Sequence, residues 1–458
     1  MRKEIITCVF FLGVIQLKAQ INEELVIEEE SRQIEYVFRD SLRQEKPVIN
    51  KYTLGNGVTF TSHDGNHSLN FTGYMQASIQ THWYDGTGDM HTRWRLRRAR
   101  FRMNGVSNQQ KIIYRIGTDF VTSNDGGDIS DRILLDAWIR YRPWSNNKLY
   151  FTFGQRSSMT DNKENFTSSQ VMQFSERSRL SSFFGTVREV GLHVQSTQKI
   201  GKMSYIKPTL VITDGDGRFS LGQRYGGLKY GGRLDYLPFG LFRAGGEFYL
   251  DDFVYELAPK LNIGTAYSYN AGTSDRRGGR SSGDILYLDD KGAITLPDFA
   301  RLNVDFLFKF RGFSALGEYT KTWAYIPNSI TTRVRNDGTT TDNFQIDGVQ
   351  DINNYIRNRM ILGSAYNIQA GYLFRSFWSV NTRYTNIRPD GYSYLNNNLY
   401  FNRNQVFEIS AAKYLTKNFA SKIQFTAGLM KTNGITRYTN GEFKGYEGTF
   451  NILTQISF

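Results

Sequence analysis

The chain ends with Glu447-Gly-Thr-Phe-Asn-Ile-Leu-Thr-Gln-Ile-Ser-Phe458, a stretch in which polar and apolar side chains alternate. Ile456 and the terminal Phe458 fall on one face of an extended chain, whereas Glu447 and Gln455 fall on the other. Side chains of a strand point alternately to opposite faces, so this stretch predicts one strand with an apolar and a polar face. Such a strand fits either a membrane barrel or the edge of a soluble sandwich.

The beginning of the chain has the pattern of a secretory signal peptide. The basic start Met1-Arg-Lys-Glu4 is followed by an apolar run from Ile5 to Leu17 and by the exit Lys18-Ala19-Gln20. This order predicts a cleaved signal over residues 1–20, because the apolar run is too short to span a bilayer. In an exported chain, a last strand that closes on Phe458 resembles the final strand of bacterial outer-membrane barrels.

The composition favours a barrel over a helical membrane protein. No stretch of 18 apolar residues follows the signal, and the mean hydropathy is −0.47. A barrel gives such a low average because its lipid-facing and lumen-facing residues alternate. An aromatic content of 15% and 43 Gly against 8 Pro are typical of interfacial aromatic girdles and of many hydrogen-bonded strands. The single cysteine, Cys8, lies in the signal, which excludes disulfides and thiolate metal sites from the exported chain.

The chain is basic. Its formal net charge is +13, and loss of three basic residues and one acidic residue with the signal lowers it to +11. An excess of basic residues is typical of proteins that bind nucleic acid. This chain is predicted to be exported and has no nucleic-acid-binding motif, so a nucleic-acid partner is not expected. We therefore expect a basic lumen that attracts small anions.

The chain divides into three parts. Residues 1–20 are the predicted signal peptide, residues 21–60 a periplasmic segment whose acidic part, 21–50, has loosely helical spacing, and residues 61–458 an outer-membrane barrel. Seventeen segments of the barrel alternate or are rich in β-forming residues: 69–82, 94–105, 111–122, 133–143, 148–156, 187–197, 204–213, 227–237, 241–251, 261–270, 300–310, 313–324, 366–375, 378–387, 404–413, 421–430 and 447–458.

Short turns and long polar loops alternate between these segments, which is the asymmetry of outer-membrane barrels. The long loops are 157–186, 271–299 and 325–360. A single-chain bacterial barrel has an even number of strands, so we expect 16 and place the miscount around residues 251–299. The predicted fold class is all-β: a transmembrane antiparallel barrel of about 16 strands.

The sharpest motif of the chain is an arginine-rich strand, Arg93-Trp-Arg-Leu-Arg-Arg-Ala-Arg-Phe-Arg-Met-Asn-Gly105. Apolar Ala99, Phe101 and Met103 share one face, so the other face carries Arg98, Arg100 and Arg102. An arginine that faces lipid at mid-depth costs about 2–4 kcal/mol, and the three arginines are therefore expected to face the lumen.

Arg95 and Arg97 fall in the apolar register of this strand, which is tolerable at the rim or if a bulge breaks the alternation. Arg115 and Arg140 are expected in the lumen on the next two strands. Permanently charged guanidinium groups at neighbouring levels set a positive potential in a narrow pore. The alternative is that these arginines pair with Asp119, Asp136 and loop carboxylates and only solvate the wall.

Residues 157–186 follow the fifth predicted strand and form the third external loop. In a porin this loop folds inward and narrows the channel, which would place Arg177 and Arg179 opposite the arginine-rich wall. A solvent-exposed lid is the alternative.

Several motifs together resemble the phosphate-selective porin O and P family over residues 60–458. The matching pieces are Asp64-Gly65 with Gly73-Tyr-Met-Gln76, Arg97-Arg98-Ala99-Arg100, Asp136-Ala-Trp-Ile-Arg-Tyr-Arg-Pro143, Gly154-Gln155 with Thr167-Ser-Ser169 and Glu176-Arg177-Ser178, and Gly312-Phe-Ser314 with Gly317-Glu318-Tyr319. The resemblance implies a 16-stranded trimeric porin of the bacterial outer membrane whose lumenal basic residues conduct phosphate or polyphosphate.

The expected function is thus a passive channel for small anions, in contact with outer-membrane lipid and without cofactor or metal. The candidate pore-lining residues are Arg98, Arg100, Arg102, Arg115, Arg140, Arg177 and Arg179. A non-selective general porin and a closed structural or adhesive barrel are the alternatives. An enzyme is not expected, because His193, which falls in the lumenal register, has no nucleophile elbow nearby.

Overall fold

The computed structural model describes residues 51–85, 90–121, 133–144, 149–186, 188–215, 226–273, 284–335, 337–396, 404–435 and 442–458. The predicted signal peptide and residues 21–50 of the periplasmic segment lie outside these residues. No helix among them is long and apolar enough to cross a membrane.

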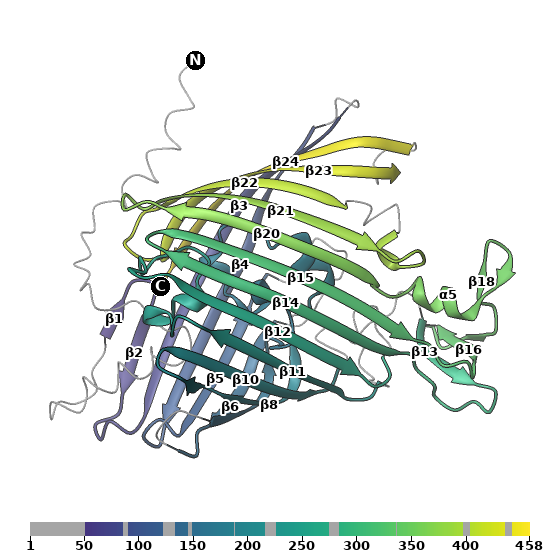
Figure 1. Ribbon diagram of the computed structural model, residues 1–458, viewed down its shortest axis with the longest axis horizontal. Helices are drawn as coiled ribbons and strands as arrows, with labels where there is room; N and C mark the ends of the chain where they lie inside the picture. Colours follow the sequence, from purple (N-terminus) through teal and green to yellow (C-terminus); the bar gives the residue numbers. More distant parts are fainter. Residues whose placement is uncertain are drawn as a thin grey trace.

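The main sheet is a closed ring in which each strand pairs antiparallel with the next (Figure 1). Within the described residues the ring has 16 strands. They are β3 (Ser68–Tyr84), β4 (Met90–Ser107), β5 (Ile112–Asp119), β6 (Leu134–Tyr141), β7 (Leu149–Arg156), β8 (Glu189–Ser196), β10 (Ser204–Thr213), β11 (Lys229–Leu237), β12 (Lys260–Asn270), β14 (Asp298–Phe310), β15 (Phe313–Tyr325), β20 (Gly363–Leu373), β21 (Trp378–Pro389), β22 (Gln405–Tyr414), β23 (Ser421–Ile435) and β24 (Glu442–Ser457). The predicted barrel and its strand number are confirmed.

The ring closes where the last strand pairs with the first. β24 pairs with β3 from Glu447↔Tyr84 to Ser457↔Tyr74. Beyond this ladder, the backbones of Phe458 and Gly73 exchange two hydrogen bonds of 2.9 Å. Because every strand then has two neighbours, the ring presents no open edge, which is the condition for a sheet to cross a bilayer.

A bulge on β4 resolves the register of the arginine-rich strand. Gln76 of β3 pairs with Arg98, but the next residue of β3 pairs with Leu96, so Arg97 is the extra residue. The bulge turns Leu96 and Trp94, 51% and 80% exposed, to the outside of the ring. Arg95 is thereby turned inward, where it donates to Gln80 Oε1 at 3.3 Å. The strand thus keeps its guanidinium groups away from lipid on both sides of the bulge.

The predicted strand at 241–251 is wrong, and it is the source of the seventeenth segment. This stretch contains the 3₁₀ helix η2 (Arg243–Phe248), and β11 pairs directly with β12. Ala244 and Gly245 have φ of 43° and 66°, and two consecutive left-handed residues interrupt an extended chain. The polar–apolar alternation is genuine, but the two glycines and the lack of a partner strand decide against a strand. The miscount therefore lies just before the region where we expected it.

Shorter elements decorate the two ends of the barrel. At the end with the long loops, β13 (Asp284–Asp289), β16 (Ile330–Arg335), β17 (Thr340–Thr341), β18 (Gln345–Ile346), β19 (Val349–Gln350) and α5 (Ile352–Arg357) form a small projection with its own apolar core (Figure 1). At the other end, the hairpin of β1 (Lys51–Thr53) and β2 (Gly57–Thr61) pairs with β3, and β9 (Gln198–Ile200) extends β8. The predicted start of the barrel at residue 61 falls on the last residue of β2.

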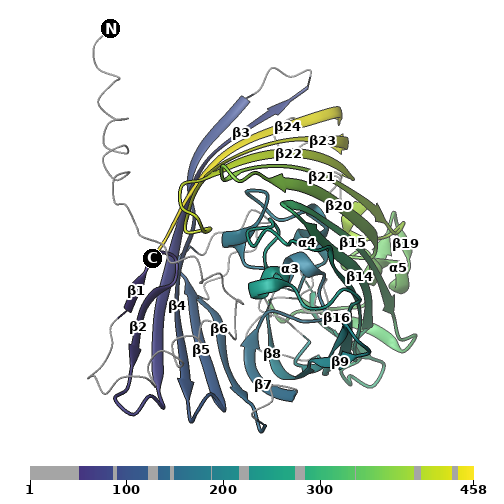
Figure 2. The same cartoon turned by 60° about the vertical axis from the view of Figure 1, so that its left-hand side comes forward.

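Residues 157–186, here called the lumenal loop, lie within the curve of the strands. Figure 2 shows its helices α3 (Lys163–Phe166) and α4 (Arg179–Phe184) inside the wall. The 3₁₀ helix η1 (Ser169–Val171) lies between them in sequence. The loop reaches β3 through Ser169 and Tyr74, whose hydroxyls lie 2.6 Å apart, and β20 through Gln173, which accepts from Gln369 at 2.9 Å.

Candidate functional site

A charged cavity of about 130 Å³ separates the lumenal loop from one side of the barrel wall. Its walls are β4 to β8 and β10 to β12, and the loop forms the opposite side. The cationic side chains of its lining are Arg100, Arg102, Arg115, Arg140, Arg156, Lys163, Arg177, Arg188 and Lys207, and the anionic ones are Asp136, Asp235 and Glu247. Cations outnumber anions three to one, so the cavity favours negative solutes.

Arg100 joins the wall to the loop. Its Nε donates to Asp119 Oδ2 at 2.8 Å on the neighbouring strand, and its Nη1 donates to Tyr74 Oη at 2.9 Å and Ser169 Oγ at 3.0 Å. Arg102, one inward position further along β4, donates a long hydrogen bond of 3.5 Å to Ser168 Oγ. Arg102 is therefore held more loosely than Arg100, although both border the cavity.

Two further arginines lie against aromatic rings of the wall. Arg115 lies 5.4 Å and Arg140 5.1 Å from the ring centre of Trp138, and Arg140 also lies 4.5 Å from that of Tyr150. Each also donates through Nε, Arg115 to an asparagine at 2.7 Å and Arg140 to a threonine at 3.0 Å. Ring stacking orients both guanidinium groups, and both side chains line the cavity.

The predicted site residues divide into two groups. Arg100, Arg102, Arg115, Arg140 and Arg177 line the same cavity. Arg177 comes from the loop, and its Nη2 donates to the Thr167 carbonyl at 2.7 Å, so part of its donor capacity serves the loop itself.

The other two predicted residues lie elsewhere. Arg98 donates to Gln76 Oε1 at 2.7 Å and lies 3.5 Å from Glu176 Oε2. Arg179 donates to Met430 Sδ at 3.3 Å, on the opposite wall, and its guanidinium lies 5.6 Å from the ring centre of Phe183. Neither belongs to the lining of the cavity.

Four basic residues of the lining were not among the predicted site residues: Arg156, Lys163, Arg188 and Lys207. Arg156 and Lys207 occupy inward positions of β7 and β10, so the alternation that identified Arg140 also applies to them. Lys163 and Arg188 lie outside the strands and carry no such signal. Arg188 Nε donates to Asp136 Oδ1 at 2.8 Å, which neutralises one of the three acids of the lining.

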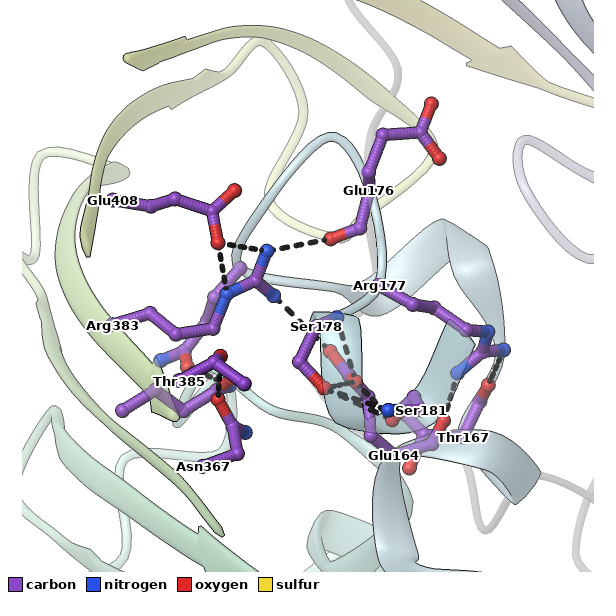
Figure 3. Close-up of polar contacts among 12 residues, drawn as sticks. Glu164, Thr167, Glu176, Arg177, Ser178, Ser181, Asn367, Arg383, Thr385 and Glu408 are labelled. Atoms are coloured by element: carbon purple, nitrogen blue, oxygen red, sulfur yellow. Dashed lines mark hydrogen bonds and ion pairs between the residues drawn. The ribbon is translucent and has the colours of Figure 1, made fainter. Parts of the chain in front are cut away.

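On the far side of the loop, Arg383 fastens the loop to the wall (Figure 3). Arg383 is 1% exposed and lies 2.6 Å from Glu408 Oε2 on the next strand. It lies 3.3 Å from Glu164 Oε1 and donates to the Glu176 carbonyl at 3.1 Å, both on the loop. Its guanidinium also lies 4.1 Å from the ring centre of Phe174. The contacts of Arg383 therefore attach the lumenal loop to the barrel wall.

Glu164 extends the attachment within the loop. Its Oε2 accepts hydrogen bonds from Ser178 N at 2.9 Å, from Ser178 Oγ at 2.7 Å and from Ser181 Oγ, as Figure 3 shows. Its backbone N–H donates to Glu318 Oε1 on β15 at 2.8 Å. Every side-chain oxygen of this buried carboxylate is hydrogen-bonded, so the loop has a defined conformation.

Glu176 faces the arginines of β4 from the loop. Arg97 pairs with its carboxylate through two nitrogens, one of them 2.6 Å from Oε2. Burial alone would raise the pKa of Glu176, but the charges of Arg97 and Arg98 outweigh burial and lower the pKa to about 2. Glu176 is therefore an anion at neutral pH, and it neutralises charge at the bulge of β4.

Comparison with known proteins gives one family match. Residues 49–241 match the family model "Phosphate-selective porin O and P", which confirms the resemblance seen in the sequence. No curated protein sequence matches the chain.

The structure also resembles solved structures of other proteins at low sequence identity. The channel DcaP of Acinetobacter baumannii has a TM-score of 0.48 at 13% identity and covers 88% of this chain and 100% of its own. An anion-selective porin from Comamonas acidovorans has a TM-score of 0.47 at 10% identity, covering 86% and 100%. OmpT of Vibrio cholerae, in a trimer form, has a TM-score of 0.45 at 8% identity, covering 86% and 100%.

Proposed function

We propose that this protein, a porin of the bacterial outer membrane, is a passive diffusion channel that prefers small anions. The observation that carries the proposal is the cavity between wall and lumenal loop, whose lining has three cationic side chains for each anionic one. The family match and the barrel point to a channel and not to an enzyme.

The physical basis of the preference is fixed charge in a narrow, partly desolvated passage. At about 4 Å, a unit charge pair is worth about 1 kcal/mol in bulk water and about 4 kcal/mol at the lower effective dielectric near protein. Arg102, Arg115 and Arg140 all line the cavity, so an anion that passes interacts favourably with several cationic side chains. A cation meets the same potential as a barrier.

Small oxyanions fit this lining best among anions. A guanidinium presents a planar fork of donors that matches the oxygens of phosphate or carboxylate. Several forks at neighbouring positions allow an oxyanion to exchange one donor pair for the next without full dehydration. Phosphate, in one of its anionic forms, is therefore the solute that we propose to test first.

Replacement of Arg102 by Gln tests the proposal with little structural disturbance, because its contacts are weak: a hydrogen bond of 3.5 Å to Ser168 Oγ and a guanidinium 6.0 Å from the ring centre of Tyr74. In a salt gradient across a planar bilayer, the variant should shift the reversal potential toward cation preference, and phosphate should block chloride current less. The matched control is Arg179→Gln, which removes the same charge away from the cavity and should shift the potential less.

The two alternatives give distinct results in this measurement. A wild-type reversal potential near zero would identify a non-selective general porin. A folded, heat-modifiable barrel without ion current would identify a closed structural barrel. Equal shifts for Arg102→Gln and Arg179→Gln would mean that net charge, and not the cavity, sets the preference.

We also propose that the protein assembles as a homotrimer. This proposal is supported by the resemblance to the phosphate-selective porins. Mass measurement in native detergent after mild extraction should give three chains per particle, and a uniform monomer would contradict the proposal.

A further inference from the structure

The connection between β11 and β12, residues 238–259, is long although it lies at the end of the barrel with short turns. Neighbouring connections at that end, such as 311–312 and 374–377, are tight. The long connection, here called the turn-end segment, is extensively buried: Asp251, Asp252 and Glu256 are all 0% exposed. Three carboxylates without solvent contact indicate that the chain folds back into the barrel instead of extending away from it.

The turn-end segment meets the lumenal loop inside the barrel. Leu250 N donates to the Val171 carbonyl at 3.4 Å, and Gln173 Nε2 donates to Asp251 Oδ1 at 3.1 Å. Tyr249 packs with Val171 in one apolar cluster, and Leu250 packs with the next residue of the loop in another. The two segments thus fill one half of the lumen together.

Asp251 fixes the segment to the wall as well as to the loop. Its carboxylate accepts from Ser379 Oγ at 2.8 Å and from Tyr414 Oη at 2.6 Å, which lie on two neighbouring strands. Lys309 Nζ donates to the carbonyls of Asp251 and Gly246, both at 2.7 Å. The segment is therefore a built part of the lumen with a defined position.

The other side of the turn-end segment borders the charged cavity. Glu247 and Phe248 belong to its lining, and Phe248 has Lys163 of the lumenal loop 5.7 Å from its ring centre. Glu247 is 6% exposed, and its Oε1 accepts from Lys207 Nζ of the wall. Its Oε2 has no hydrogen-bond donor among the described residues. A buried carboxylate oxygen without a donor among the described residues thus lies at the edge of a mainly cationic lining.

We propose that the turn-end segment is a second constriction of the channel, below the lumenal loop, and that Glu247 is its selectivity-determining residue. Phe248 narrows the passage between segment and loop. Glu247 occupies Lys207 and adds a negative charge, so it lowers the affinity for anions where they leave the cavity. A reduced affinity at one end favours release, as conduction requires. The inference rests on the proposed anion passage.

Two substitutions test the charge of Glu247 and the width of the passage at Phe248 separately. Glu247→Gln removes the negative charge and frees Lys207, so the reversal potential should shift further toward anion preference and phosphate should block chloride current at lower concentration. Phe248→Ala widens the passage and should raise single-channel conductance. The control is Leu257→Ala in the same segment, which is 62% exposed and outside the cavity lining, and which should leave both quantities unchanged.

The results separate this inference from the proposed function. If Glu247→Gln leaves the reversal potential unchanged or shifts it toward cations, while Arg102→Gln still shifts it, Glu247 has no role in selectivity. If Phe248→Ala conducts like the wild type, the segment is no constriction. A wild-type channel without anion preference would overturn the proposed function, and Phe248→Ala would still report on the constriction. Heat-modifiable mobility verifies that each variant is folded.

Discussion

Along β4 to β8 the inner wall faces a charged cavity, whereas along β14 to β22 it packs directly against the lumenal loop and the turn-end segment. Arg102 on the first side borders the cavity and donates one long hydrogen bond, of 3.5 Å, to Ser168 Oγ. Arg383 on the second side is 1% exposed and pairs with Glu408 and Glu164. Both residues are arginines at inward positions of a strand. Arg102 borders the cavity, whereas Arg383 anchors the lumenal loop to the wall.

The difference teaches that charge in the lumen is not by itself evidence of permeation. A guanidinium beside open space stays accessible, and a passing anion can replace its partner. A buried guanidinium that pairs with two carboxylates and stacks on an aromatic ring uses its N–H donors for these contacts. Separating it from a carboxylate would leave a buried charge without a counter-ion, which is unfavourable. The partners of an arginine and its position relative to the cavity therefore distinguish the anchoring Arg383 from a lining residue such as Arg102.

The largest effect is expected from Arg383→Met on the packed side. The substitution leaves the buried Glu164 and the partly buried Glu408 without this cation, and the loss of one partner of a buried pair costs about 3–5 kcal/mol. The unheated band should convert to the unfolded position at a lower temperature, and the released loop should make the current larger and noisier.

The matched control is Arg388→Met, which removes an exposed arginine from the same strand. Unchanged heat stability and current for Arg383→Met would contradict the comparison, because the loop would then be held by other contacts.

A smaller effect is expected from Glu176→Gln, which alters the contact between the two halves. The Glu176 carboxylate pairs with Arg97 on β4, and its carbonyl accepts from Arg383 on β21. Without the carboxylate the positive potential of β4 is less compensated, so the reversal potential should shift modestly toward anion preference.

The pH dependence of the wild type provides an independent check on Glu176. Its pKa lies below the ordinary value, at about 2, so its stabilising contribution is fully present above an ordinary glutamate pKa and is lost only as pH falls through about 2. Selectivity that depends on the pair should therefore stay constant from neutral pH down to about 3. If the selectivity of the wild type changed near the ordinary glutamate pKa, and that of Glu176→Gln did not, the ion pair between Glu176 and Arg97 would be contradicted.

The smallest effect on the channel is expected from deletion of Phe458, which lies in neither half of the lumen. The deletion removes the two backbone hydrogen bonds to Gly73 and a ring so close that a Cβ at Gly73 would lie 2.6 Å from it. Assembly yield should fall, whereas conductance and selectivity of the assembled barrel should equal those of the wild type. A change in selectivity would mean that the seam between β24 and β3 shapes the lumen.

Most of the barrel wall could be predicted from sequence because its rules are local. Sixteen of the predicted segments correspond to strands of the ring, since a period of 2 fixes which side chain faces lipid. The failure at 241–251 has the same origin: its alternation is as clear, but a strand also needs a neighbour, and β11 and β12 already pair with each other.

The candidate site was predictable only in part. The sequence identified Arg100, Arg102, Arg115 and Arg140 because they occupy inward positions of strands. It could not tell that Arg98 turns to Gln76 and Glu176, since the bulge at Arg97 and the position of the lumenal loop depend on distant residues.

The sequence by itself determined a closed antiparallel barrel with a basic interior, because side-chain alternation and the cost of charge in lipid act residue by residue. Only the tertiary structure decided which charges meet. The lumenal loop and the turn-end segment have no periodic pattern, and their positions depend on contacts such as Gln173 to Asp251 and Glu164 to Arg383, between residues far apart in the chain. These contacts close one half of the lumen and leave the cavity, with its excess of cations, in the other.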